Sequence, residues 1–85
     1  MRPVTVYTRA FCPYCTAALS LLRRKGAPVT EIDATMDVQQ RVEMQRRSGR
    51  NTFPQIFVGE THVGGCDDLH DLDADGALDP LLAGG

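Results

Sequence analysis

The sequence of 85 residues has no tryptophan and no apolar run near the roughly 20 residues that a membrane-spanning helix needs. Its first seven residues lack the apolar stretch of a secretory signal peptide. Aromatic residues make up only 6%, and no basic stripe with interleaved aromatics is present, which argues against nucleic-acid binding. These absences predict one small cytoplasmic domain over residues 1–85, with no membrane or nucleic-acid partner.

Basic residues are missing from the C-terminal part of the chain. All nine Lys and Arg lie in residues 1–50 beside four acidic residues, whereas residues 51–85 carry seven acidic residues, so the net charges are +5 and −7. Such a division can indicate an anionic ligand or a charged partner. In a compact fold the two halves interleave, so ordinary solvated faces explain it equally well.

Cysteine is also scarce, and two of the three cysteines stand in the segment Cys12-Pro13-Tyr14-Cys15. If Cys12 caps a helix, Pro13 takes the first helical position, where its missing N–H costs nothing. The free N–H groups of Tyr14 and Cys15, with the helix dipole, then favour the thiolate form of Cys12. Cys12 is therefore predicted to be the nucleophile.

Cys15 begins an apolar stripe with the spacing i, i+3, i+4 and i+7, which continues through Ala18, Leu19 and Leu22. This predicts a buried resolving thiol. A helical start brings two cysteines three apart within disulfide reach, roughly 5–6 Å between their Cα atoms. A structural disulfide and half of a zinc site are the alternatives, but such a motif beside a β-α-β pattern in a reducing compartment is more often a redox dithiol.

Strands and helices alternate in the predicted order. Strands are expected at residues 4–7, 29–33, 55–58 and 61–64, the last two forming a hairpin, with a loop at residues 8–11. Helices are expected at residues 13–25, at 37–48 with support from Val38 and Val42, and from a cap at Asp67 or Asp68 to about Ala74. Leu78, Leu81 and Leu82 suggest a last short helix.

With the dithiol at the first strand-to-helix junction, this order resembles the thioredoxin fold, an α/β architecture with a four-stranded mixed sheet flanked by helices. Three segments make the chain similar to the glutaredoxins of the bacterial glutaredoxin 3 type: Cys12-Pro13-Tyr14-Cys15, Thr52-Phe53-Pro54 and Gly64-Gly65-Cys66-Asp67-Asp68. The resemblance implies an enzyme that reduces protein disulfides and protein–glutathione mixed disulfides. Glutathione is then the electron-donating co-substrate, and no cofactor or metal is bound.

The resemblance also implies where glutathione binds. In the family, the residue before a cis-proline offers its backbone to the glutathione cysteine, and the matching residues are Phe53 and Pro54, preceded by Thr52. The γ-glutamyl end is implied to lie at Gly65, Cys66 and Asp67. Helix-terminal N–H groups suit its carboxylate, and the Asp67 side chain suits its ammonium. A trans Pro54 in an ordinary turn, and an Asp67 that only caps a helix, are the plainer interpretations.

The second glutathione carboxylate needs a cation, and the matching positions are Arg9 and Arg41, while Tyr14 is implied to line the groove. Each of these could instead be an ordinary surface side chain. Cys66 could be a small buried residue, an oxidation site or half of a regulatory disulfide. His62 and His70 are interpreted as ordinary surface or edge residues.

Two positions depart from the family pattern. Phe53 stands where valine is common, and Arg9 stands where lysine is usual. Because Phe53 would act through its backbone, glutathione binding should survive, while the larger ring narrows the choice of glutathionylated partners. Arg9 keeps the positive charge and adds bidentate geometry towards a carboxylate.

Two other functions remain open. A redoxin reduced directly by thioredoxin reductase would usually lack the segment Gly65-Cys66-Asp67. A carrier in which two chains and two glutathiones hold an iron–sulfur cluster through Cys12 is the second, although Pro13 is usually associated with glutaredoxins that do not bind one. The partners expected from the resemblance are glutathione and disulfide-containing or glutathionylated proteins, and a monomer is expected.

Overall fold

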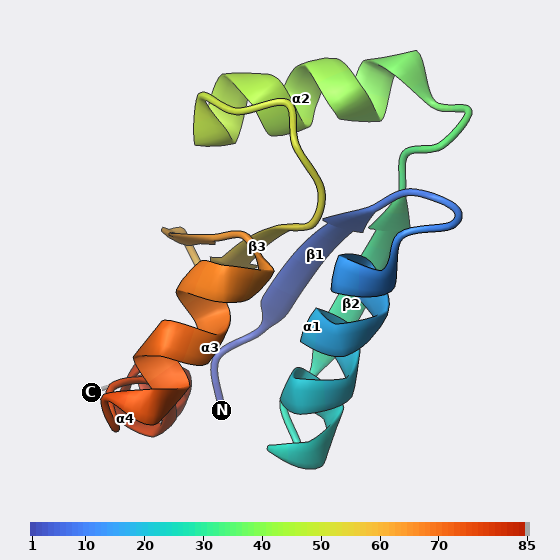
Figure 1. Cartoon of the computed structure of the whole chain (residues 1–85). Coiled ribbons are helices and arrows are strands. Elements are labelled where there is room, and N and C mark those ends of the chain that lie inside the picture. The colour runs from blue at the N-terminus through green and yellow to red at the C-terminus, as the bar shows by residue number, and fades with distance from the viewer. Residues whose placement is uncertain (85) are drawn as a thin grey trace.

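The computed structural model describes residues 1–84, which form a four-stranded mixed sheet with helices on both faces (Figure 1). The elements are β1 (Val4–Thr8), α1 (Pro13–Arg24), β2 (Val29–Asp33), α2 (Val38–Ser48), β3 (Gln55–Val58), β4 (Thr61–Gly64), α3 (Cys66–Ala74) and α4 (Leu78–Ala83). The strand order is β2-β1-β3-β4. β1 is parallel to β2 and antiparallel to β3, which is antiparallel to β4. The predicted mixed sheet is confirmed.

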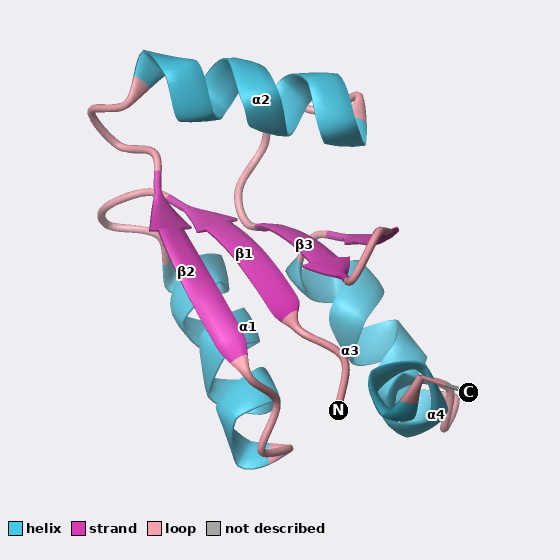
Figure 2. Cartoon of the chain, turned by 180° about the vertical axis from the view of Figure 1, so that it is seen from behind, coloured by secondary structure: helices cyan, strands magenta, loops and turns pink. Residues whose placement is uncertain are grey.

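Two apolar clusters hold the layers together, one on each face of the sheet. Figures 1 and 2 show α1 and α3 on one face and α2 across the other. Because successive strand side chains point to opposite faces, Val6 and Ile56 pack with the α1 and α3 cluster. Tyr7 and Phe57 instead pack with Met44 of α2, and the Tyr7 and Phe57 rings meet edge to face with centroids 5.9 Å apart.

α2 begins and ends as predicted but faces the sheet through a different residue. Asp37 caps it through a bond from the Gln40 N–H to Oδ1 of 3.1 Å, and Gly49 ends it in a left-handed conformation at φ 71°. Val38 and Val42, which supported the helix in the sequence, are exposed at 73% and 59%, and Met44 is the buried residue. The apolar spacing therefore indicated the helix correctly but not its buried face.

Two predicted boundaries need correction. Thr8, expected in the loop, is the last residue of β1, because it pairs with Asp33 of β2 and its hydroxyl donates to Glu31 Oε2 at 2.8 Å. α3 starts at Cys66 with Gly65 as its N-cap, so neither Asp67 nor Asp68 is the N-cap residue. Asp68, in the first turn, reaches back to accept from the Gly65 N–H at 2.9 Å.

Ion pairs connect the basic and acidic parts of the chain. Lys25 at the end of α1 contacts Asp73 at 2.7 Å and Asp79 at 3.0 Å, and Arg50 contacts Asp68 at 3.0 Å. The division of charge along the sequence is thus partly neutralised in space. Among residues 1–84, no helix combines the length and apolar character needed to cross a membrane.

Candidate functional site

Cys12 is the N-cap of α1, as the sequence predicts. Its backbone is extended, at φ −118° and ψ 98°, and its Sγ accepts a hydrogen bond from the Cys15 N–H at 3.2 Å. Pro13 occupies the first turn, where the helix needs no donor. Phe11, just before Cys12, adopts a left-handed conformation at φ 55° and is fully exposed. The sulfur of Cys12 therefore sits at the positive end of a helix.

Cys15 lies one helical turn further and is buried at 3% exposure. Burial, followed by the hydrogen bond to Cys12, raises the pKa of the Cys15 thiol to about 12, and the negative charge of Cys12 adds to this. A backbone hydrogen bond from Arg9 opposes the shift. The two thiols are therefore unequal, since Cys15 stays protonated at neutral pH while Cys12 accepts a helix N–H.

The peptide bond between Phe53 and Pro54 is cis and lies against the dithiol. The Cys12 Sγ is 3.9 Å from the carbonyl oxygen of Phe53. The Arg41 guanidinium lies over the Phe53 ring, 5.9 Å from its centroid. Residue 53 thus presents its backbone to the thiol and its side chain towards α2.

A groove of about 550 Å³ is lined by Arg9, Tyr14, Arg41, Asn51, Thr52 and Phe53. It brings together side chains from the loop before α1, from α2 and from the segment before β3. Arg41 is fixed there, because its Nε donates to the Ala34 carbonyl at 2.8 Å and its Nη2 to the Thr35 carbonyl at 2.7 Å. The groove has two cations at its rim and an aromatic ring, Tyr14, that is 64% exposed. Such a surface suits an anionic ligand.

The segment at residues 65–67 lies beside the cis-proline. A Cβ added to Gly65 would be 3.5 Å from the carbonyl oxygen of Pro54, so the two backbones are close neighbours. Cys66 is buried at 8% exposure, and its Sγ lies 3.4 Å from His70 Nδ1. Burial raises the pKa of the Cys66 thiol, as do the charges of Asp67 and Cys12.

Asp67 and Asp68 have different roles although they are neighbours. Asp68 accepts from the Gly65 N–H and pairs with Arg50, and these two contacts hold the pKa of its carboxyl below the ordinary value. Asp67 is exposed, and among residues 1–84 its carboxylate makes no hydrogen bond or ion pair. The capping role that the sequence left open for Asp67 therefore belongs to Asp68, and the Asp67 carboxylate is available to a ligand.

Comparison with known proteins decides the family. A sequence model described as Glutaredoxin matches residues 4–63, which is more than half of the chain. The chain belongs to the glutaredoxin family. It is 51% identical over 82 residues to glutaredoxin 3 of Escherichia coli K12, covering 96% of this chain and 99% of that protein. The bacterial glutaredoxin 3 type is thereby confirmed, and the chain is a thiol–disulfide oxidoreductase.

Solved glutaredoxin structures confirm the thioredoxin-like fold. The solution structure of glutaredoxin from Brucella melitensis is 61% identical, with a TM-score of 0.84, covering 96% of this chain and 89% of that one. A crystal structure of a buckwheat glutaredoxin–glutathione complex is 28% identical, with a TM-score of 0.86, covering 96% of this chain and 77% of that one. The chain therefore has the same architecture as both of these glutaredoxins.

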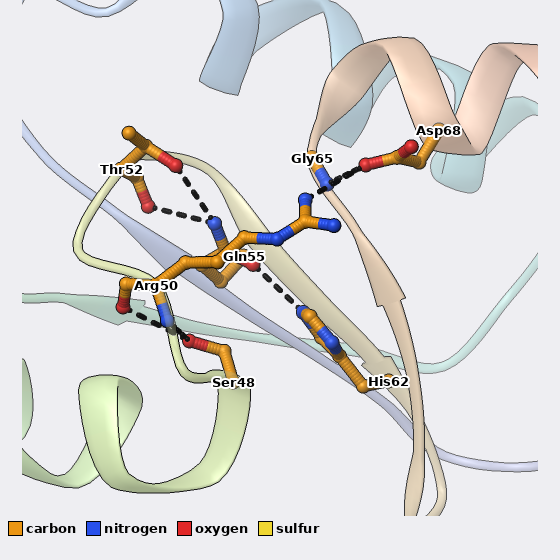
Figure 3. Close-up of polar contacts among 7 residues, drawn as sticks. All are labelled: Ser48, Arg50, Thr52, Gln55, His62, Gly65 and Asp68. Carbon is orange, nitrogen blue, oxygen red and sulfur yellow. Dashed lines mark hydrogen bonds and ion pairs between the residues drawn. The ribbon is translucent and has the colours of Figure 1, made fainter.

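Sequence reasoning assigned no role to Asn51 or to Gln55, and Figure 3 shows Gln55 between Thr52 and His62. Asn51 lines the groove, and His62 is half-buried with its Nε2 2.8 Å from Gln55 Oε1. Burial and the nearby Arg50 charge lower the pKa of His62 below its usual value. His62 lies on the edge strand β4, as the interpretation as an edge residue expected, but it is half-buried there. The one available signal was Gln55 itself, a polar residue at the head of an otherwise apolar strand.

Proposed function

We propose that the chain reduces mixed disulfides between glutathione and other thiols, and protein disulfides, at Cys12 with glutathione as the electron donor. The observation that carries this proposal is the groove from Arg9 to Phe53, which lies beside a cysteine at a helix N-terminus. The buckwheat glutaredoxin whose structure includes glutathione supports it, because that protein has the same fold.

Glutathione offers two carboxylates, one ammonium and one thiol, and the groove together with the segment at residues 65–67 offers partners for these groups. The backbone of Phe53 would pair with the cysteine of glutathione as an added strand. Arg9 and Arg41 would bind one carboxylate. The N–H groups at the start of α3 suit the γ-glutamyl carboxylate, and the unpaired Asp67 suits the ammonium.

Reduction of a mixed disulfide needs only Cys12. Its thiolate attacks the glutathione sulfur, the bond between that sulfur and the substrate sulfur breaks, and the substrate leaves as a thiolate that takes up a proton. Cys12 is then disulfide-bonded to glutathione. A glutathione thiolate from solution attacks the glutathione sulfur of this bond, which restores the Cys12 thiolate and releases glutathione disulfide. One free glutathione is consumed, and the other half of the glutathione disulfide comes from the mixed disulfide itself.

Reduction of a protein disulfide also needs Cys15. Cys12 attacks one sulfur of the substrate and forms a mixed disulfide with it. At that point Cys12 no longer carries a negative charge or accepts a hydrogen bond from Cys15, so two of the causes that raise the Cys15 pKa are gone. Cys15 can then lose its proton and attack the Cys12 sulfur, which frees the substrate and leaves a Cys12–Cys15 disulfide for two glutathiones to reduce.

A coupled assay tests the electron donor. The purified protein is given a small glutathione mixed disulfide with glutathione, glutathione reductase and NADPH, or with thioredoxin reductase and NADPH alone. The proposal predicts turnover only in the first mixture. Turnover with thioredoxin reductase alone would assign the chain to the redoxins that this reductase serves.

A further inference from the structure

Gln55, the first residue of β3, is completely buried although its side chain is polar. All four residues of β3 are buried, and the other three are apolar. An amide in such a place costs free energy unless each of its polar atoms is hydrogen-bonded, whereas an aliphatic side chain has no such requirement. The contacts of this amide therefore indicate which part of the molecule it holds in place.

The Gln55 amide hydrogen-bonds to Thr52, in the segment before β3, and to His62 of β4 (Figure 3). Its Nε2 donates to the Thr52 carbonyl oxygen at 3.1 Å and to the Thr52 Oγ1 at 3.0 Å. Both hydrogens of the NH₂ group are thus used, and Oε1 faces His62 Nε2 at 2.8 Å. Since Oε1 can only accept, the His62 ring must carry a hydrogen on Nε2.

Both ends of this connection are themselves fixed. The His62 ring packs on the Phe57 ring with centroids 5.0 Å apart, so the side chain of His62 is held in place by β3. Thr52 directly precedes Phe53 and lines the groove. A second contact, from Arg50 to Asp68 at 3.0 Å, joins the same segment to the start of α3. The segment before the cis-proline is therefore connected to β4 through Gln55 and His62, and to α3 through Arg50 and Asp68.

We propose that Gln55 is a positioning residue for glutathione, holding the carbonyl and hydroxyl of Thr52 so that the Phe53 backbone faces the ligand. This inference rests on the proposed function. Gln55 is fully buried and so acts through Thr52 without touching the substrate. Loss of the amide should loosen glutathione binding, while the N-cap bond from the Cys15 N–H to the Cys12 sulfur stays in place.

The test is a steady-state analysis of Gln55→Met, a substitution of similar length that removes all three hydrogen bonds. The KM for a small glutathione mixed disulfide should rise about fivefold, the factor that corresponds to one neutral hydrogen bond. The kcat should stay within about twofold, because the dithiol is untouched. Melting temperatures of all variants are measured in parallel.

The matched control is Ile56→Val, at the next residue of the same strand, which is also fully buried. It weakens the core without contacting Thr52 and should leave KM unchanged. A KM that rises equally in Ile56→Val and Gln55→Met would show that loss of stability is the cause, and would overturn the proposal.

A second pair of variants at His62 applies even where Gln55→Met folds poorly, because His62 is half-buried on the edge strand. A glutamine there can still donate to Gln55 Oε1, so His62→Gln should keep the wild-type KM. His62→Phe cannot donate, and its KM should rise in the same direction as that of Gln55→Met. Identical KM values for the two His62 variants would overturn the proposal.

The failure of this inference differs from failure of the proposed function. If the wild-type protein shows no turnover with glutathione, the proposed function itself is wrong. If the wild type and Ile56→Val turn over normally and Gln55→Met has an unchanged KM, only the positioning role of Gln55 is refuted.

Discussion

The two walls of the groove are built in different ways. The wall that carries the dithiol is local, because Cys12 accepts from the N–H of Cys15 three residues later and both belong to the start of α1. The opposite wall, residues 50–54, is held by contacts that span 7 residues from Gln55 to His62 and 18 residues from Arg50 to Asp68. Reactivity is thus encoded in one tetrapeptide, whereas ligand binding depends on how distant segments meet.

Substitution of the nucleophile in the wall formed by the start of α1 should have the strongest consequence. Cys12→Ser should abolish reduction of both glutathione mixed disulfides and protein disulfides, because Cys12 is the thiol that caps a helix and lies beside the groove, 3.9 Å from the Phe53 carbonyl oxygen. Activity is measured with both substrate classes in the coupled assay. Residual turnover above the uncatalysed rate would mean that a second thiol can act as the nucleophile.

Cys15→Ser should separate the two reactions. Reduction of glutathione mixed disulfides should continue, while most reduction of protein disulfides should be lost, since only that reaction needs a resolving thiol. Alkylation of the wild type by iodoacetamide at about pH 8 is a useful control. It should modify Cys12 before Cys15, whose pKa of about 12 keeps it protonated. Equal loss of both activities in Cys15→Ser would be incompatible with the mechanism.

Asp67→Ala, at the start of α3, should raise the KM for a glutathione mixed disulfide roughly tenfold. A charge-assisted hydrogen bond to the glutathione ammonium contributes on the order of 1.5–3 kcal/mol, and tenfold corresponds to about 1.4 kcal/mol. Stability should change by less than about 1 kcal/mol, because Asp67 contributes only its charge near the helix N-terminus.

Asp68→Ala is the matched neighbour for this test. It removes the acceptor for the Gly65 N–H and should lower the free energy of unfolding by about 1 kcal/mol. Asp68→Ala also removes the ion pair with Arg50, so the two variants are compared by their free energies of unfolding, and the KM of Asp67→Ala is compared with that of the wild type. An Asp67→Ala protein that is less stable but has an unchanged KM would return the capping role to Asp67.

The smallest effect concerns the pH dependence of stability at His62, which contacts Gln55 behind residues 50–54. Burial lowers the folded-state pKa of His62 below its ordinary value of 6.5, so the unfolded chain binds a proton that the folded site resists. The stability contributed by neutral His62 is complete above about pH 6.5 and is lost as the pH falls through its lower folded pKa. Chemical denaturation between about pH 8 and about pH 5 should show the wild type losing more stability than His62→Gln. Parallel losses in the two proteins would show that His62 is not linked to folding.

The sequence predicted the local wall almost completely. The N-cap at Cys12 and the first-turn Pro13 follow from the tetrapeptide alone, and the burial of Cys15 follows from the apolar spacing that continues to Leu22 in the same helix. The end of α2 was also predicted correctly, because a single residue, Gly49, adopts the left-handed conformation that ends the helix. These features need no information about distant parts of the chain.

The failures lie where partners are far apart in sequence. Thr8 extends β1 because Asp33 pairs with it across the sheet, and nothing near Thr8 indicates that partner. Val38 and Val42 fit a helical spacing but face solvent, because the sheet lies under Met44. Asp68 rather than Asp67 contacts the Gly65 N–H, since the N-cap is Gly65, two residues before Asp67 and three before Asp68. Each error reflects tertiary packing that overrides a correct local pattern.

The most direct test of the account is to trap the first covalent intermediate. The Cys15→Ser variant is incubated with glutathione disulfide and then digested and analysed by mass spectrometry without reduction. The expected product carries one glutathione per chain, attached to Cys12, because that sulfur accepts the helix N–H and lies 3.9 Å from the Phe53 carbonyl oxygen beside the groove. An unmodified Cys12, or glutathione attached to Cys66 instead, would contradict it.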